Sequence, residues 1–117
     1  MPLLQELKQR ICRFNMSPGW LPPNYPLGGL VEWAEASGLS PDRLLSLLGT
    51  VQTELEAELD ALDRDPQASP HTRLRHEYWC FYCEQIRSYY LALLNHPEYK
   101  DRLALIRRVS AAIDENA

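Results

Sequence analysis

The stretch SPDRLLSLLGTVQTELEAELDALDRDPQASP, residues 40–70, predicts the centre of the fold. It begins with Ser40 and Pro41, a helix cap followed by a proline at the first helical position. Apolar residues then recur every three or four positions, which is the spacing of one helix face: Leu44, Leu48, Val51, Leu55, Leu59 and Leu62. A polar turn ends this helix, and a second Ser-Pro pair at 69–70 begins the next. Two long helices joined by so short a turn are expected to be antiparallel neighbours.

Helical patterns also lie on both sides of this hairpin. Residues 2–14 have apolar side chains at helical spacing, so they are predicted to form a short amphipathic helix. Another helical pattern runs from Leu30 to Ser37, and Gly38 follows where a left-handed residue ends a helix. The helix from Pro70 is expected to reach about Asn95, and a last one starts after it. The predicted packing stripe of this last helix is Tyr99, Leu103, Ile106, Val109 and Ile113. With no strand pattern or internal repeat, the sequence predicts an all-α bundle of four to five helices.

The segment NMSPGWLPPNYPLGG, residues 15–29, separates the first helix from the rest. It carries four prolines and three glycines, so we expect an extended Pro-rich segment. The domain organisation predicted is a single helical domain over residues 1–117. Residues 1–29 form its N-terminal helix plus Pro-rich arm, and residues 30–117 form the main bundle.

Composition and charge narrow the class of protein. A chain of 117 residues that is 45% hydrophobic is expected to fold as one globular domain. Its net charge is −4, and residues 21–70 hold nine acidic side chains against two arginines, which argues against a nucleic-acid partner. The sequence has no membrane-length apolar run and no signal-peptide pattern, and its three cysteines suit a reducing compartment. We therefore expect a cytoplasmic protein without a membrane partner.

The motif HEYWCFYC, residues 76–83, places His76, Cys80 and Cys83 on one helix face. A structural zinc site needs four ligands, and no spacing selects the fourth. A redox pair belongs at a helix N-terminus, whereas Cys80 lies well inside its helix. Packing of the cysteines at the core is the favoured interpretation, with metal binding and redox chemistry as the alternatives. We expect no metal and no cofactor.

Catalysis would require a recognisable set of nucleophilic, acidic or basic side chains. The sequence contains no nucleophile elbow, phosphate loop, HExxH or paired-carboxylate motif. The nearest candidate pair is Cys80 with His76, and the sequence identifies no third group to orient the histidine. The expectation is a protein without catalytic residues, that is, not an enzyme.

The stretch LVEWAEASGLSPDRLLSLL, residues 30–48, resembles the helix-turn-helix of bacterial repressors. Ala34 stands where the first helix needs a small residue, Gly38 opens the turn, and three leucines match buried positions: Leu39, Leu44 and Leu47. The resemblance implies two helices crossing at a sharp angle, the second of which enters the major groove. The positions that would face the nucleobases hold Ser40, Pro41, Asp42, Leu45 and Ser46, and Arg43 is the only basic residue nearby. Recognition helices usually read DNA with Arg, Lys, Asn or Gln, so a DNA-binding regulator is the alternative function and not the main hypothesis.

The N-terminal helix and arm carry the main functional hypothesis. Their apolar side chains either fold back on the core of the chain or lie on another molecule. In size, helical content and lack of catalytic motifs, the chain resembles small bacterial antiactivators and anti-sigma-type proteins. We expect a homodimeric, non-enzymatic regulator that binds a protein and sequesters a transcription factor. The predicted partner-binding residues are the apolar anchors Leu7, Ile11, Phe14, Trp20 and Tyr25, with Lys8, Arg10 and Arg13 steering an acidic partner.

Overall fold

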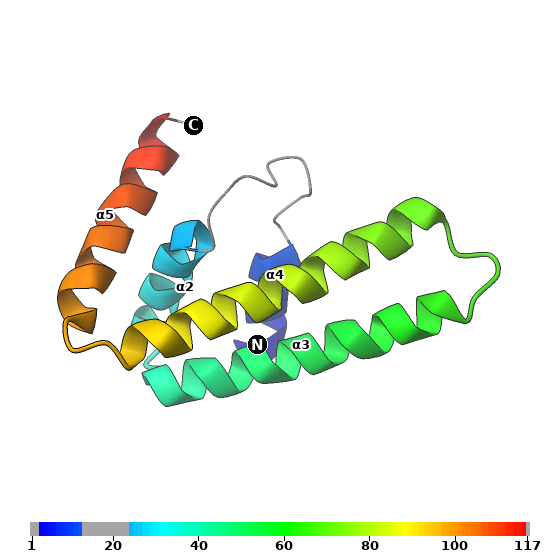
Figure 1. Ribbon diagram of the computed structural model, residues 1–117, viewed down its shortest axis with the longest axis horizontal. Helices are drawn as coiled ribbons and strands as arrows, with labels where there is room; N and C mark the ends of the chain where they lie inside the picture. Colours follow the sequence, from blue (N-terminus) through cyan, green and yellow to red (C-terminus); the bar gives the residue numbers. More distant parts are fainter. Residues whose placement is uncertain (1–2, 13–23, 117) are drawn as a thin grey trace.

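The computed structural model describes residues 3–12 and 24–116, and these form five helices. They are α1 (Leu3–Cys12), α2 (Asn24–Ala36), α3 (Pro41–Asp63), α4 (Pro70–Leu94) and α5 (Tyr99–Asn116). No strand occurs in the described part of the chain. The predicted all-α fold class is confirmed (Figure 1).

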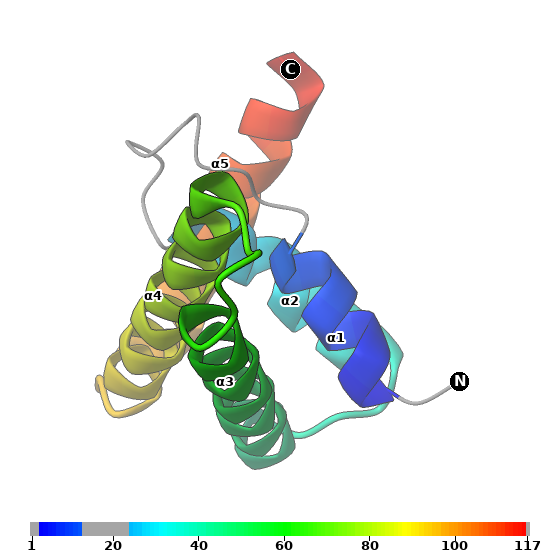
Figure 2. The same cartoon turned by 90° about the vertical axis from the view of Figure 1, so that its right-hand side faces the viewer.

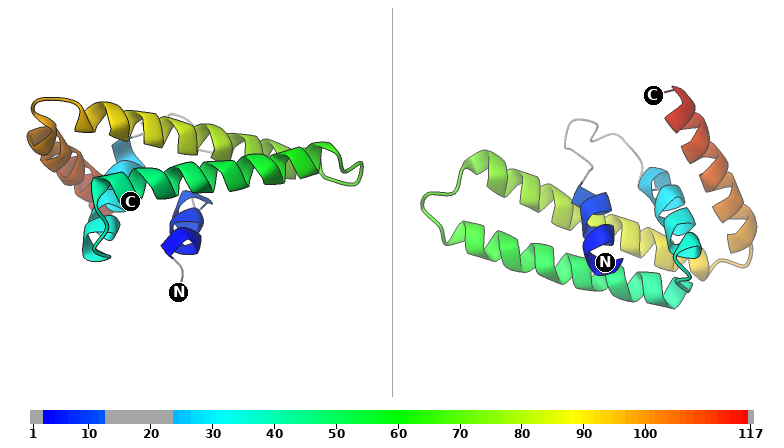
Figure 3. Two further views of the ribbon diagram at one scale, coloured as in Figure 1. Left: turned by 90° about the horizontal axis from the view of Figure 1, so that it is seen from below. Right: turned by 180° about the vertical axis from the view of Figure 1, so that it is seen from behind.

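The helices are arranged around the long α3–α4 hairpin, whose two arms run antiparallel (Figure 1). Helices α1 and α2 lie together on one side of this hairpin, at a steep angle to it (Figures 2 and 3). Helix α5 packs mainly against α2, near the end of the hairpin where α4 finishes. The hairpin thus forms one layer and α1 and α2 the other, while α5 is attached to the edge.

The helix ends follow the predicted local chemistry. The side-chain oxygen of Ser40 accepts a hydrogen bond from the backbone N–H of Arg43 at 3.2 Å. Ser69 caps α4 in the same way, accepting from the N–H of Thr72 at 3.1 Å. Gly38 has a φ of 76°, the left-handed conformation predicted for it. Helix α4 ends at Leu94, one residue before the predicted limit near Asn95, and α3 ends one residue after Leu62, the last residue of its predicted apolar face.

The start of α2 corrects one prediction. The helix begins at Asn24, whereas the sequence interpretation kept residues 15–29 extended and began the helix at Leu30. Pro26 is the third residue of α2, within the first turn, where backbone N–H groups have no intrahelical acceptor. Its missing N–H therefore costs this helix no hydrogen bond. Residues 15–23 lie outside the described part of the chain.

The core forms where α1, α2 and the hairpin meet. The predicted apolar face of α3, here called the α3 seam, is buried there from Leu44 to Leu55, whereas Leu59 and Leu62 are half-buried. Leu48, Val51 and Leu55 are all 0% exposed. Ile86 of α4 lies opposite this face. Residues of α1 and α2 also belong to the cluster: Leu7, Ile11, Leu27, Leu30, Val31, Trp33 and Ala34. Full burial of each large aliphatic side chain stabilises the fold by about 1.5–3 kcal/mol. The buried part of the α3 seam therefore packs against other helices of the same chain.

Candidate functional site

The predicted anchors on α1 are core residues in this structure. Leu7 and Ile11 are both 0% exposed, because α1 lies directly on the hairpin. A partner could contact them only if α1 left the hairpin. In this structure these two side chains therefore pack on the core of their own chain. Arg13, Phe14 and Trp20 lie outside the described residues. Tyr25 falls in the first turn of α2, and its side chain is not among those described.

The two predicted steering cations on α1 are engaged inside the chain. Lys8 pairs with Glu58, and its Nζ lies 3.5 Å from a carboxylate oxygen of Glu54. The guanidinium of Arg10 lies 3.9 Å from the Glu6 carboxylate and 5.5 Å from the ring centre of Trp33. These contacts fasten α1 to α2 and α3. Both cations are thus engaged within the chain, and their role in steering an acidic partner stays a prediction.

The Lys8–Glu58 pair shifts the pKa values of both groups. The hydrogen bond to Glu58 is the largest effect on Lys8, and it raises the pKa of the ammonium. For Glu58 the largest single effect is burial, which raises the pKa. The hydrogen bonds and charges of Lys8 and His76 outweigh burial, so the pKa of Glu58 is lowered overall. Both shifts favour the charged pair, which therefore contributes to stability.

We expect Lys8→Met to lower the free energy of unfolding at neutral pH by about 1 kcal/mol or less, because both charges are partly exposed to solvent. The contribution of Glu58 is present above its ordinary pKa of 4.5 and is lost as the pH falls through its lower folded value. That of Lys8 is present below 10.5 and is lost as the pH rises through its higher folded value. Urea unfolding should thus show the largest difference between about pH 5 and pH 10, and it should shrink beyond both limits.

The matched control for this substitution is Arg43→Met, which removes one exposed positive charge from the first turn of α3. If both variants lose stability equally and with the same pH dependence, the ion pair is not the cause.

The three cysteines are free thiols. Cys83 is in the core, and its Sγ donates to the backbone oxygen of Leu48 at 3.5 Å. Burial raises the pKa of Cys83 to about 12 and that of Cys12 to about 11, and it also raises the pKa of Cys80. Thiols of this kind stay protonated at neutral pH, which makes them poor nucleophiles. Among the described residues no group of three or more potential ligands is arranged to hold a metal ion.

His76 is held by two oxygen atoms. Its Nδ1 lies 3.1 Å from the backbone oxygen of Thr72, and its Nε2 lies 3.2 Å from Oε1 of Glu58. The sequence revealed no group that orients His76, because Glu58 is on the other arm of the hairpin. Both ring nitrogens therefore lie against oxygen atoms of other residues. The arrangement links α3 to α4.

The corner formed by α2, Gly38 and α3 has the shape that the helix-turn-helix resemblance implies, since the two helices cross steeply (Figure 1). Ser40, Asp42 and Arg43 are exposed at the start of α3. Arg43 remains the one cation among the exposed side chains of this first turn. DNA binding through this corner stays a prediction.

The exposed apolar residues point to a different surface. Helix α5 buries Ile106 and partly buries Tyr99 and Leu103 against the rest of the fold. Leu105 and Val109, one turn apart, are 53% and 44% exposed. The sequence interpretation had placed Val109 in the packing stripe, so this assignment was wrong. The stripe of α5 is narrower than predicted because α5 lies at the edge of the fold.

The charges around this pair are mostly positive. Arg102 and Arg108 lie three residues before and after Leu105, close enough on a helix to flank it. Arg107 pairs with Glu35 at 2.6 Å, whereas no ion pair within the described residues involves Arg102 or Arg108. We call Leu105, Val109, Arg102 and Arg108 the α5 outer surface. A second exposed apolar pair, Leu74 and Phe81, lies on α4 at 48% and 58% exposure.

Comparison of the chain with protein-family models, with curated proteins and with solved structures gave no match. None of the helices in the described part of the chain has the length and apolar character needed to cross a membrane.

Proposed function

We propose that this protein is a non-enzymatic regulator that acts by binding another protein through the α5 outer surface. The observation that carries the proposal is the second apolar strip of α5. A helix that already buries Ile106 against its own fold also exposes Leu105 and Val109. Two exposed aliphatic residues flanked by arginines are compatible with a protein interface, in which arginine is enriched and a polar rim surrounds an apolar centre.

The charges of this surface define the chemistry of the partner. The α5 outer surface has two cations, Arg102 and Arg108, and Asp101 is the single acid between residues 100 and 109. An acidic segment that presents apolar side chains to Leu105 and Val109 would fit this surface. Cations at the rim speed the association of such a partner. A transcription factor with an acidic helix or extended segment would meet these requirements. Binding of such a segment would sequester the factor, which is the action of an antiactivator or anti-sigma protein.

A second copy of this chain fits the α5 outer surface less well. The apolar face of α3 from Leu44 to Leu55, which could have formed a dimer contact, is covered within the chain. In a two-fold dimer each contact surface faces its own copy, so the Arg102 and Arg108 side chains of both protomers would come together. Like charges brought together oppose association. We therefore place an acidic partner protein, and not a second protomer, on this surface.

The proposal is tested by affinity capture from the native host with the full chain, using two matched double variants. Leu105→Ser with Val109→Ser alters the α5 outer surface, whereas Leu74→Ser with Phe81→Ser alters the exposed pair on α4. Loss of an anchor is expected to weaken binding by about 2 kcal/mol, roughly 30-fold. Circular dichroism checks that both variants fold, since exposed substitutions usually change stability by about 0.5 kcal/mol or less.

The expected result is an acidic protein retained by the wild type and by the α4 variant, and lost from the α5 variant. A partner bound equally by all three proteins contradicts the assignment of the surface. Retention of nucleic acid that is abolished by Arg102→Gln with Arg108→Gln, but unchanged by the serine substitutions, would favour the DNA-binding alternative. Light scattering of the wild type and the α5 variant detects a homodimer that uses the same surface.

A further inference from the structure

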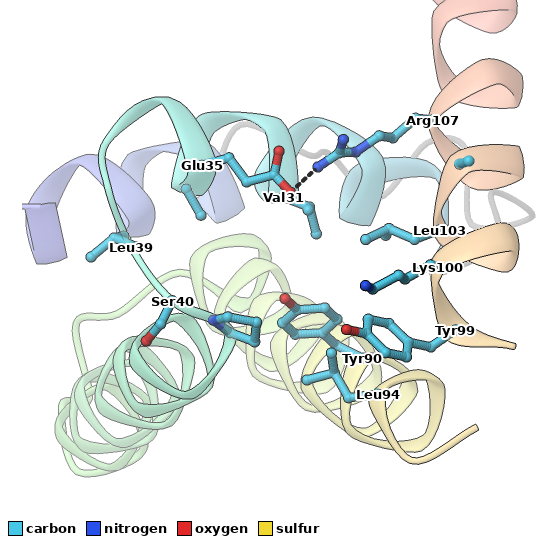
Figure 4. A pocket seen from close by; sticks show the side chains of 13 residues that line it. Val31, Glu35, Leu39, Ser40, Tyr90, Leu94, Tyr99, Lys100, Leu103 and Arg107 are labelled. Atoms are coloured by element: carbon cyan, nitrogen blue, oxygen red, sulfur yellow. Dashed lines mark ion pairs between the residues drawn. The ribbon is translucent and has the colours of Figure 1, made fainter. Parts of the chain in front are cut away.

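A pocket of about 350 Å³ lies between α2, the end of α4 and the start of α5, on the inner side of α5 (Figure 4). Its volume is at the small end of the range of about 300–1,000 Å³ for ligand pockets. Six of the lining side chains are aliphatic: Val31, Ala34, Leu39, Leu94, Leu103 and Ala104. An apolar body of modest size is therefore compatible with its walls.

Three polar groups point into this pocket together. The hydroxyl groups of Tyr90 and Tyr99 and the ammonium group of Lys100 are directed towards the space beneath α2 (Figure 4). They come from two helices, because Tyr90 lies on α4 while Tyr99 and Lys100 open α5. The ring of Tyr90 is fixed in the core, with 2% of the residue exposed. The hydroxyl position is thus set by packing and not by the ligand.

The charge inside the pocket is positive in effect. Glu35, the one acidic side chain of the lining, is paired with Arg107 at 2.6 Å. Lys100 has no ion pair with any described residue. Burial, and the negative charge of Glu35 after it, raise the pKa of the Tyr90 hydroxyl, which keeps that group a hydrogen-bond donor. One free cation and two hydroxyl donors around an apolar space match a singly charged anionic head group.

We propose that this pocket binds a small amphipathic monocarboxylate. Its carboxylate would lie against the ammonium group of Lys100 and the hydroxyls of Tyr90 and Tyr99, and its apolar body would fill the space lined by Leu94 and Leu103. A body and head group of about ten non-hydrogen atoms suit a pocket of this size. The proposal does not rest on the function proposed for the α5 outer surface, because the pocket is on the inner side of the helix.

Three probes of similar length test the head group and the body separately. Octanoate, 1-octanol and octylamine are titrated into the full chain at neutral pH, and binding is followed by changes in amide NMR shifts. Octanoate is expected to bind, to shift signals of residues that line the pocket and to raise the melting temperature. Octanol should bind more weakly, by at least about tenfold, because it lacks the charge-assisted contact, and octylamine should be excluded by Lys100.

Lys100→Met separates a built site from non-specific binding. It should weaken octanoate by up to about fivefold, as expected for an ion pair of an exposed lysine, while leaving octanol nearly unchanged. Arg87→Met removes the same charge beside Gly49, away from this pocket, and should leave octanoate affinity unchanged. If octanoate does not bind at about 1 mM, its affinity is too weak for a ligand site and the proposal is overturned. Equal affinity for octanoate and octanol, or an unchanged affinity in Lys100→Met, overturns it as well.

Discussion

Replacing Ile11 by alanine is expected to lower the free energy of unfolding by about 2–4 kcal/mol, as for other large-to-small changes in a packed core. Ile11 is 0% exposed and belongs to the same cluster as the α3 seam. The substitution leaves a cavity under α1 that the hairpin helices cannot close without moving. A side chain reserved for a partner would instead change the stability of the free protein by about 0.5 kcal/mol or less.

Gln9→Ala is the matched control, because Gln9 lies on the same helix and is exposed. Both proteins are unfolded in urea and followed by far-ultraviolet circular dichroism. Leu7→Ala should behave like Ile11→Ala, since Leu7 is also 0% exposed. If Ile11→Ala unfolds at the same urea concentration as Gln9→Ala, α1 does not contribute to the core in solution. In that case its apolar face is available to a partner, as one of the sequence hypotheses holds.

The features that the sequence predicted correctly are local ones. A Ser-Pro pair caps a helix through its own side chain and the next turn, so Ser40 and Ser69 act within a few residues of themselves. The conformation of Gly38 depends on the helix it ends. The seam of α3 follows from the spacing of apolar residues within that single helix. None of these features needs knowledge of which other helix lies nearby.

The helix α2 starts earlier than predicted because proline breaks a helix only beyond its first turn. Pro26 shows that the rule depends on place, since a first-turn proline removes a donor that has no acceptor in the helix. The sequence leaves open for another reason whether Ile11 packs on the chain or on a partner. An apolar face that packs on the chain and one that packs on a partner have the same spacing and composition, so only the tertiary contacts distinguish them.

The candidate sites depend on helices that are distant in the sequence. His76 is oriented by Glu58 only because α3 and α4 are antiparallel with one particular alignment. The pocket needs α2, α4 and α5 to meet at one corner. The exposure of Val109 follows from the position of α5 at the edge, where only one side of the helix is covered. The sequence pattern showed which residues are apolar but not how wide the covered face would be.

Replacing Trp33 by alanine is expected to destabilise the protein by about 3–5 kcal/mol, the usual cost of removing a buried indole. Trp33 is 8% exposed and joins α2 to α1. Its Nε1–H donates to the Glu6 carboxylate at 2.9 Å, and the Arg10 guanidinium lies 5.5 Å from its ring centre. The loss therefore combines a cavity with the removal of two contacts to α1, and it is measured by urea unfolding.

Trp33→Phe separates these contributions, because phenylalanine keeps an aromatic ring but cannot donate to Glu6. We expect it to cost less than Trp33→Ala, with about 1–2 kcal/mol arising from the lost hydrogen bond to a charged group and the smaller ring. A double-mutant cycle with Glu6→Ala then measures the coupling between α1 and α2, expected at about 0.5–1.5 kcal/mol. A coupling near zero would mean that Glu6 and Trp33 do not interact in solution. A clear coupling would show that α1 is fastened to α2 by side chains on both helices, so that a partner using its inner face would have to break this contact as well as expose Leu7 and Ile11.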